Sequence, residues 1–390
     1  MSVAVEREET FLASVRRIAD EVAAPNADAV DREARFPTET LDALKEERAL
    51  SAFVPERFGG DDIGFEAIAG ACFELGRRCA ASAMVFAMHQ IQVACIVRHL
   101  DDAPWFEDYL RELAATQRLI ASVTSEVGTG GDMSRSNAAV VSQDGTCSFE
   151  KQAPTVSYGA FADDLFTTLR RSPEAEPGDQ VVVLTSREQH TLEQTGTWDP
   201  LGMRGTCSPG YVVRGSFPSE QVLPTPFAHV AAESMVPVSH VLWSHIWLGI
   251  ATDAFDRARA FVRAQAKQRP GETPPTAARL SQLMSELSPL RAEVRSSLAE
   301  FVAASDEPGR ERLSTMAAAL RFNNLKIAAS EQAPRVCQGA MGICGIVGYK
   351  NDTPFSIGRH LRDSMSAVLM VANDRIHQTN AGLLLVAKDV

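Results

Sequence analysis

The chain has 390 residues, of which 45% are hydrophobic and 23% charged, a composition typical of a globular protein with room for two or three domains. Its formal net charge of −12 comes from 38 lysines and arginines against 50 aspartates and glutamates, and it disfavours a general nucleic-acid binder, which needs clustered positive charge. The start of the chain lacks the pattern of a signal peptide, and the apolar run Ala80–Val97 is interrupted by His89, Gln90 and Gln92. We therefore expect a cytoplasmic protein with no membrane-spanning segment.

The seven cysteines are scattered along the chain, odd in number and mostly set among apolar residues. A disulfide framework pairs its cysteines, and a metal site needs cysteines or histidines at short spacings. No cysteine in this sequence forms such a ligand pair with a nearby histidine. We expect reduced core cysteines and no metal site.

The first quarter of the chain repeats apolar residues at helical spacing. Four helices are expected, at Glu8–Ala24, Pro37–Leu50, Phe65–Arg78 and Ala81–His99. Pro25 is expected to end the first helix, and Thr38 to cap the second. The fourth is apolar on nearly all sides and should be buried. Its His89 is either a ligand contact or a hydrogen-bonded structural residue, the commoner role of a histidine on a buried helix.

From Leu119 the spacing of apolar residues changes to two. The stretch Leu119–Asp132, LIASVTSEVGTGGD, predicts a buried strand that runs into a glycine-rich turn. Glycines there permit positive φ and a close approach of the backbone to a ligand, and the Ser125 hydroxyl could meet polar atoms of a flat cofactor. A tight turn without a ligand has the same spacing, so this pattern alone does not identify a site.

Short apolar or alternating runs continue beyond this turn, and they predict a small β-barrel or sandwich. They lie at Ala138–Val141, Cys147–Phe149, Phe166–Leu169, Val181–Thr185 and Tyr211–Phe217. Ser157 follows Ser125 by about thirty residues, and two hairpins could bring it alongside the glycine turn. Trp198–Ser208, WDPLGMRGTCS, is expected to be a loop.

Helical spacing returns after Pro237. Four long segments rich in alanine and leucine, Val241–Lys267, Ala277–Ser305, Glu311–Cys337 and Ser364–Lys388, predict a four-helix bundle. The predicted fold is therefore a multi-domain α+β protein. It would consist of an N-terminal helical domain (1–117), a central β-barrel or sandwich (118–228) and a C-terminal helical bundle (229–390).

Four segments in order resemble the acyl-CoA dehydrogenase superfamily over nearly the whole chain. FVPERFGG resembles the family's P…yGG turn, SEVGTGGD its TEPGAGSD-like loop, WDPLGMRGTCS its W-x-x-L-G-x-R-G-S/T signature, and CGIVGYKNDTPFSIGRHLRD its GGxGY…P…R…RD segment. The resemblance implies a non-covalent FAD between the β-domain and the bundle. It also implies a homodimer or homotetramer in which a second subunit completes the FAD site.

The resemblance further implies particular flavin contacts. Ser125 and Gly130 belong to the loop that faces the isoalloxazine ring, and Ser157 takes the place of the residue that hydrogen-bonds the N5 edge. Gly345 belongs to a turn that approaches the adenosine half from the neighbouring subunit. Asn373 stands where members have a threonine near the adenosine and pyrophosphate.

The sequence departs from the family at the substrate side. Family dehydrogenases use a glutamate to remove an α-proton, but Val371 stands at its position and Ser239–His240 at the alternative position. Gly131 replaces a loop serine that often touches the CoA portion of the thioester, and Thr155 replaces a tryptophan. Gly131 and His89 are the predicted substrate contacts.

Three functions remain open. The first, which the sequence favours, is α,β-dehydrogenation of an acyl thioester of CoA or a carrier protein, with an electron-transfer flavoprotein as redox partner. Its base would lie elsewhere, at Glu233, His240, Asp374 or His377. The second is a reduced-flavin-dependent monooxygenase served by a flavin reductase, with Ser157, His89 and His377 near the ring. The third is a non-catalytic homologue.

Overall fold

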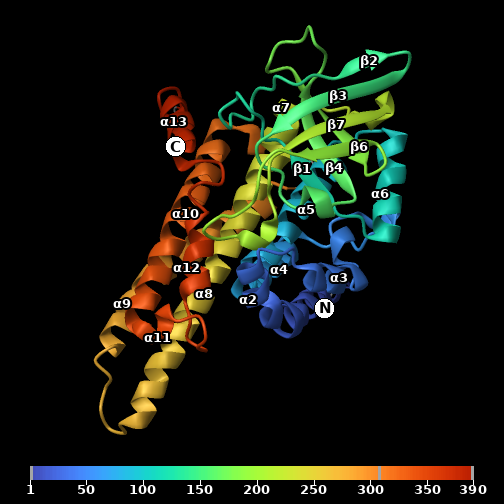
Figure 1. Ribbon diagram of the computed structural model, residues 1–390. Coiled ribbons are helices and arrows are strands. Elements are labelled where there is room, and N and C mark those ends of the chain that lie inside the picture. Colours follow the sequence, from blue (N-terminus) through green and yellow to red (C-terminus); the bar gives the residue numbers. More distant parts are fainter. Residues whose placement is uncertain (1–2, 306–308, 388–390) are drawn as a thin grey trace.

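The computed structural model describes residues 3–305 and 309–387 of the chain (Figure 1). Helices at the N-terminal end and a region of small sheets lie together along one flank of a long helical bundle (Figure 1). This order of helices, sheets and bundle confirms the predicted multi-domain α+β class. The boundaries after residues 117 and 228 stay predictions.

The N-terminal part packs around one buried helix, α5. Its helices are α1 (Val3–Ile18), α2 (Ala24–Glu33), α3 (Thr38–Glu46), α4 (Phe65–Arg78), α5 (Ala80–His99) and α6 (Pro104–Thr116). Contrary to the expectation from its histidine and glutamines, α5 is long and apolar enough to cross a membrane. However, 89% of its most apolar stretch is buried inside the protein, as in the core helix of a globular domain.

Several local expectations were wrong in this part. Pro25 does not end a helix, because it lies in the first turn of α2, where its missing N–H is not needed. A π-helical turn, Ala19–Ala23, joins α1 to α2. Thr38 does not cap α3, whose N-cap residue is Pro37. Helix α6 was not expected from the sequence.

Two small sheets form the middle of the chain. The strands are β1 (Ile120–Val123), β2 (Val141–Gln143), β3 (Thr146–Ala153), β4 (Asp164–Arg170), β5 (Gln180–Ser186), β6 (His190–Gln194) and β7 (Tyr211–Pro218). One sheet has the order β1-β4-β5, with β1 parallel to β4, and the other has the antiparallel order β2-β3-β7-β6. Strands β4 and β5 are buried along nearly their whole length, so the first sheet is covered on both faces. β6 was not expected.

The bundle consists of three long helices and shorter C-terminal ones. Its elements are α7 (Phe227–Val230), α8 (Val236–Gln268), α9 (Ala277–Ala303), α10 (Met316–Cys344), α11 (Ile346–Tyr349), α12 (Gly358–Met365) and α13 (Asn373–Leu384). The expected helix Ser364–Lys388 is broken by a turn at residues 366–372, and Lys388 itself lies outside the described residues. In this turn Val371 has a φ of 48°, a left-handed conformation that β-branched residues rarely adopt.

Glycines set the junction between the N-terminal part and the bundle. Helices α4 and α8 cross where Gly76 and Gly249 allow their backbones to approach. A Cβ on Gly76 would lie 2.8 Å from the carbonyl oxygen of Ile246, and one on Gly249 would lie 2.5 Å from that of Phe73. Larger residues at either position would push the helices apart.

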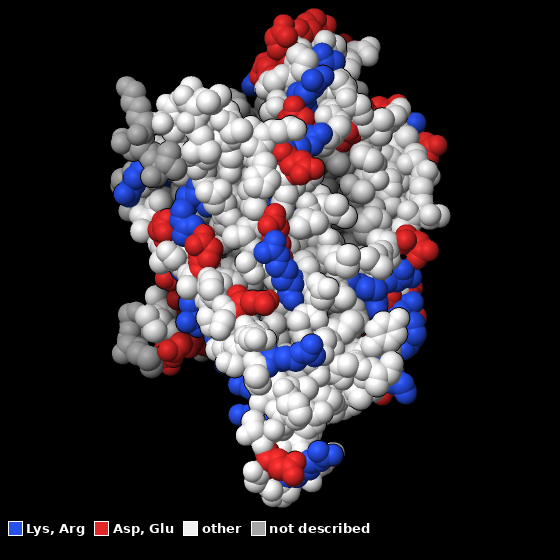
Figure 2. All heavy atoms as spheres, turned by 90° about the vertical axis from the view of Figure 1, so that its left-hand side faces the viewer, with Lys and Arg blue, Asp and Glu red and all other residues white. Residues whose placement is uncertain are grey.

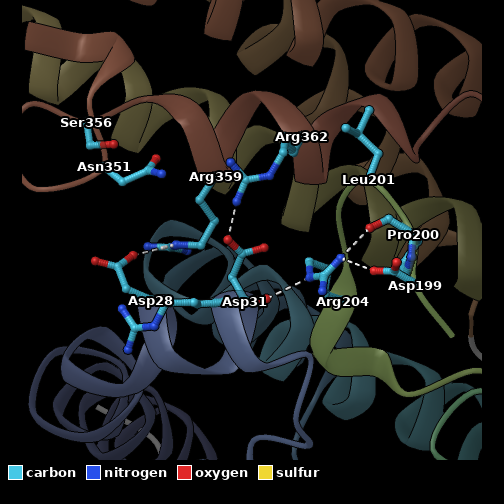
Figure 3. Close-up of a pocket in the computed structure, with 11 residues that line it drawn as sticks. Asp28, Asp31, Asp199, Pro200, Leu201, Arg204, Asn351, Ser356, Arg359 and Arg362 are labelled. Carbon is cyan, nitrogen blue, oxygen red and sulfur yellow. Dashed lines mark hydrogen bonds and ion pairs between the residues drawn. The ribbon is translucent and has the colours of Figure 1, made fainter.

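A charged cleft of about 560 Å³ marks the place where the three parts meet (Figure 3). The carboxylate of Asp31 on α2 pairs with Arg362 of α12, and its backbone carbonyl accepts a hydrogen bond of 2.8 Å from Arg204 of the β region. Beside them, Arg359 pairs with Asp28 at 3.0 Å. These contacts tie all three parts of the chain together.

The β region and the bundle have a further direct link at Asp363. The backbone N–H of Met203 donates a hydrogen bond of 2.7 Å to the buried Asp363 carboxylate. Burial raises the pKa of Asp363 to about 6, although Arg359 opposes the shift. We call Asp31, Arg204, Arg362 and Asp363 the interdomain clamp.

The substitution Asp31→Ala should destabilise the whole fold. Arg362 would lose its half-buried carboxylate partner, which should lower the free energy of unfolding by about 2 kcal/mol. Thermal or urea unfolding measures this change. As a control, Asp108→Ala removes an exposed carboxylate whose ion pair, among the described residues, is with Arg111 on the same helix, and it should leave the melting temperature unchanged. Equal effects of the two substitutions would contradict the importance of the clamp.

Candidate functional site

Glu126 braces the glycine loop that follows β1. Its carboxylate accepts hydrogen bonds from the Ser136 hydroxyl at 2.6 Å and from the backbone N–H groups of Asn137 and Ala138 at 2.9 and 2.7 Å. The ammonium of Lys151 on β3 lies 3.6 Å away, and both side chains are buried. Burial lowers the pKa of Lys151 to about 8, and the charge of Glu126 opposes this shift. The buried Glu126 carboxylate thus connects the start of the loop, where Glu126 lies, to its end at residues 136–138.

Small hydroxyl side chains line neighbouring loops of the β region. The Ser125 hydroxyl donates a hydrogen bond of 2.6 Å to the Thr155 carbonyl, so the structure brings together the two loops that carry Ser125 and Ser157. Ser208 donates to Ser157 at 2.9 Å and shares a hydrogen bond of 2.9 Å with Thr206. We call these five residues the hydroxyl rim. Ser125, Thr155 and Ser157 retain solvent exposure, so they can meet the polar edge of a ligand.

The glycine loop faces the start of α13. Gly130 and Gly131 have φ angles of 61° and 83°, and a Cβ on Gly130 would lie 3.0 Å from Nη2 of Arg375. The Arg375 guanidinium has no hydrogen bond or ion pair with any residue that the structure describes, although its charge contributes to lowering the pKa of Asp132. A free guanidinium beside an open glycine backbone is suited to bind an anion.

Asn373 is the first residue of α13, two positions before Arg375, and its side-chain amide is already hydrogen-bonded. Its Oδ1 accepts a hydrogen bond of 2.7 Å from the Lys326 ammonium, and its Nδ2 donates one of 3.1 Å to Ser330. These partners belong to α10, so Asn373 joins α13 to α10. A flavin contact through this side chain would require the exchange of these bonds.

Gly345 lies in the turn between α10 and α11, where it adopts a φ of 59°. No heavy atom lies within 4 Å of a Cβ built on it. This turn is at the opposite end of the bundle from α13 (Figure 1). Within one chain Gly345 therefore does not join the other predicted residues, and its contact with a flavin would require a second subunit.

The ring of His89 is fully engaged by backbone groups. Its Nδ1 accepts a hydrogen bond of 3.1 Å from the Ile120 N–H, and its Nε2 lies 2.7 Å from the Leu50 carbonyl oxygen. Nε2 must therefore carry the proton, and burial lowers the pKa of this neutral ring to about 4. This geometry favours the structural role for His89, because no ring nitrogen is left for a substrate.

Neither family position for the glutamate base provides a carboxylate. The Val371 carbonyl accepts a hydrogen bond of 2.9 Å from the Lys326 ammonium. His240 is buried, with Nδ1 3.1 Å from the Phe322 carbonyl oxygen. Burial, together with the charge of Lys326, lowers the pKa of His240 to about 3. The buried Lys326 ammonium thus contacts one of the two positions and acts electrostatically on the other.

The remaining candidate bases are Glu233, Asp374 and His377. Glu233 belongs to a π-helical turn before α8, and its carboxylate is 4.0 Å from His229. Asp374 and His377 are exposed on α13. No structural feature distinguishes any of the three as a base.

Sequence reasoning missed Lys326, Arg375 and the pair of Glu126 with Lys151. Lys326 lies five residues after Arg321 in the segment LRFNNLKIAAS of α10, and its helical spacing from the apolar residues could have indicated burial. Nothing in the sequence distinguishes Arg375 from other charged residues near the C-terminus. Its importance depends on the fold that places it against the glycine loop.

Comparison with known families adds to this geometry. Residues 5–117 match the family described as acyl-CoA dehydrogenase, N-terminal domain. Residues 231–371 match acyl-CoA dehydrogenase, C-terminal domain. Together the two matches cover both helical parts of the chain.

Relatives of different activities share this fold. The amino sugar nitrososynthase DnmZ of Streptomyces peucetius is 24% identical over 339 residues, which cover 84% of this chain and 81% of that protein. Cyclohex-1-ene-1-carbonyl-CoA dehydrogenase of Geobacter metallireducens is 23% identical over 388 residues, which cover 98% of each chain. The X-ray structure of KijD3 in complex with FMN and dTDP-3-amino-2,3,6-trideoxy-4-keto-3-methyl-D-glucose superposes with a TM-score of 0.81 at 22% identity, covering 100% of this chain and 95% of that one.

The substitution Glu126→Ala should release the glycine loop. It leaves Lys151 buried without its carboxylate, which should cost about 3–5 kcal/mol in urea unfolding and expose residues 128–137 to proteolysis. The double variant Glu126→Ala/Lys151→Met removes both charges and should recover part of the lost stability. A double variant as unstable as the single one would show that the ion pair does not brace the loop.

Proposed function

Because this chain belongs to the acyl-CoA dehydrogenase family of flavin-dependent enzymes, we propose that it is a reduced-flavin-dependent monooxygenase with that fold. The observation that carries the proposal is the buried Lys326 ammonium bound to the Val371 carbonyl, in a chain with no carboxylate at either base position, Val371 or Ser239–His240. Oxygen transfer needs no base for an α-proton, whereas thioester dehydrogenation does. The sequence alone favoured the dehydrogenase, and Lys326 reverses that preference.

The charge near Val371 opposes a dehydrogenase mechanism. The Lys326 ammonium donates a hydrogen bond to the Val371 carbonyl, at the turn where the family base stands. A protonated amine cannot accept a proton, and its field favours anions over cations. This part of the site can therefore orient a substrate through a donor, but it has no ionised carboxylate to abstract a proton.

The residues of the β region fit a flavin. The hydroxyl rim offers donors and acceptors to the polar edge of an isoalloxazine ring, with Ser125 and Ser157 as the proposed contacts. The glycine loop at Gly130, with the Arg375 guanidinium beside it, offers backbone and charged donors to a flavin phosphate. When bound, reduced flavin reacts with dioxygen, so that one oxygen atom enters the substrate and the other leaves as water.

The identity of the flavin and of the substrate extends the proposal. FAD is the cofactor that the family resemblance implies, whereas the KijD3 structure holds FMN, and both carry the phosphate that Arg375 would meet. A nitrososynthase of amino sugars and a structure with a bound amino sugar nucleotide are among the relatives. We therefore propose a small substrate with an oxidisable amine, and a cytoplasmic flavin reductase as redox partner.

A homodimer or homotetramer is the proposed assembly. Charged side chains are sparse over wide areas of the bundle face in Figure 2. Large apolar residues are exposed on the C-terminal segments, among them Ile346, Tyr349, Leu369 and Leu385, which are 68–87% exposed. Burying such residues against a second subunit is favourable, and Gly345 lies on the neighbouring turn.

Oxygen consumption tests the proposed reaction. Supplied with a flavin reductase, NADH and a panel of amino sugars, the protein should consume oxygen in step with formation of an oxidised nitrogen product. Acyl-CoA thioesters should not bleach protein-bound flavin under anaerobic conditions. Bleaching by a thioester would instead establish the dehydrogenase, the reaction named for the relative that covers 98% of this chain.

The substitution Arg375→Gln should weaken the binding of FMN about tenfold, because one charge-assisted hydrogen bond to the phosphate is lost. The affinity for riboflavin, which has no phosphate, should be unchanged. Fluorescence titration of both flavins measures the two constants. Equal losses for FMN and riboflavin would argue against a phosphate at the glycine loop.

A further inference from the structure

Lys326 is a fully buried lysine in the middle of α10. Its ammonium donates hydrogen bonds to the Val371 carbonyl oxygen at 2.9 Å and to Oδ1 of Asn373 at 2.7 Å. Val371 belongs to the turn that leads into α13, and Asn373 is the first residue of that helix. Among the residues that the structure describes, no carboxylate forms an ion pair with Lys326, and the face of Trp247 lies 5.8 Å from the ammonium.

The start of α13 has little else to hold it. Only three residues of this helix are buried, Asn373, Ile376 and Asn380, so apolar packing contributes little. Asn380 accepts a hydrogen bond of 2.8 Å from Asn323 of α10. The preceding turn contains Val371 in its left-handed conformation, which persists only where its surroundings hold it. Lys326 binds the carbonyl of this same strained residue, Val371.

The first turn of α13 also carries Arg375. Its guanidinium lies against Gly130 and Gly131, yet it forms no hydrogen bond or ion pair with another described residue. The position of Arg375 therefore depends on how α13 is held at its start. Among the described residues, Lys326 is the only charged group that hydrogen-bonds to the start of α13.

We propose that Lys326 is a positioning residue, which holds the start of α13 so that Arg375 is presented to the flavin phosphate at the glycine loop. The inference rests on the proposed flavin site and adds a residue that never touches the flavin. It also explains why a charged side chain is retained in the bundle interior without a carboxylate partner.

The protonation of Lys326 should make this positioning depend on pH. Burial lowers its pKa to about 8, with Glu331 of α10 opposing the shift. His240 of α8 stays neutral, and Asp374 and Arg375 are the nearest charged residues along α13. The ammonium is therefore charged below pH 8. Its hydrogen bonds to Val371 and Asn373 should weaken as the pH rises through that value.

Two measurements on full-length variants test the proposal. In Lys326→Met, hydrogen exchange of residues 372–384 should accelerate, and the affinity for FMN should fall about tenfold, as for loss of a charge-assisted hydrogen bond. In Lys326→Arg, which keeps the charge, both properties should stay near those of the wild type. Lys45→Met makes the same change at a half-buried lysine of α3, and it should alter neither.

The wild type should show faster exchange of residues 372–384 and weaker FMN binding at about pH 9 than at about pH 7, and Lys326→Met should lose this pH dependence. Unchanged exchange in Lys326→Met, or the same pH dependence in that variant, would overturn the proposal. Faster exchange with unchanged FMN affinity would overturn the link to the flavin and point to a misplaced flavin site. Oxygen consumption without any effect of Lys326 on exchange would leave the proposed reaction standing and remove this inference alone.

Discussion

The interdomain clamp around Asp31 is the contact on which the geometry of the site depends. The hydroxyl rim and the glycine loop belong to the β region, whereas Lys326 and Arg375 belong to the bundle. Neither group forms a site alone. Because Asp31 binds Arg204 through its carbonyl and Arg362 through its carboxylate, a shift of one part strains its contacts with the others. The charged cleft thus fixes the β region relative to the bundle. It thereby sets the distance between the hydroxyl rim and glycine loop on one side and Lys326 and Arg375 on the other.

The sequence predicted the elements whose residues follow a clear period. The helix Phe65–Arg78 has the expected bounds, because its apolar face alternates cleanly with charges. The C-terminal helix was wrong, because the turn before Asn373 is stabilised by Lys326, a contact between segments far apart in sequence. The motifs predicted neighbouring loops for Ser125 and Ser157, just as periodic spacing predicted the helices. Both predictions depend on short stretches of sequence. The unpaired Arg375 could not be inferred, since its environment exists only in the folded chain.

Donors dominate the place where family dehydrogenases hold a base. Lys326 contributes an ammonium, and the buried indole N–H groups of Trp243 and Trp247 on α8 have no partner within the described residues. A buried donor without an acceptor is costly, so a ligand that offers oxygen or nitrogen lone pairs would relieve it. The family fold is thus retained, while Val371 and Ser239–His240 stand at the positions that the family resemblance assigns to the base. Lys326 connects the substitution at Val371 with the polar contacts between α10 and α13.

The contact between α5 and β1 makes the stability of the fold depend on pH in acidic solution. His89 bridges the backbones of Leu50 and Ile120 as a neutral ring, with a pKa of about 4 against 6.5 for an unfolded chain. Between these values the unfolded chain binds more protons than the folded one, so stability is lost as the pH falls below 6.5. His240 and His245 add to this loss, because burial also holds their pKa values at about 3 and about 4. Acidification would therefore destabilise both the junction of α5 with β1, through His89, and the bundle around α8, through His240 and His245.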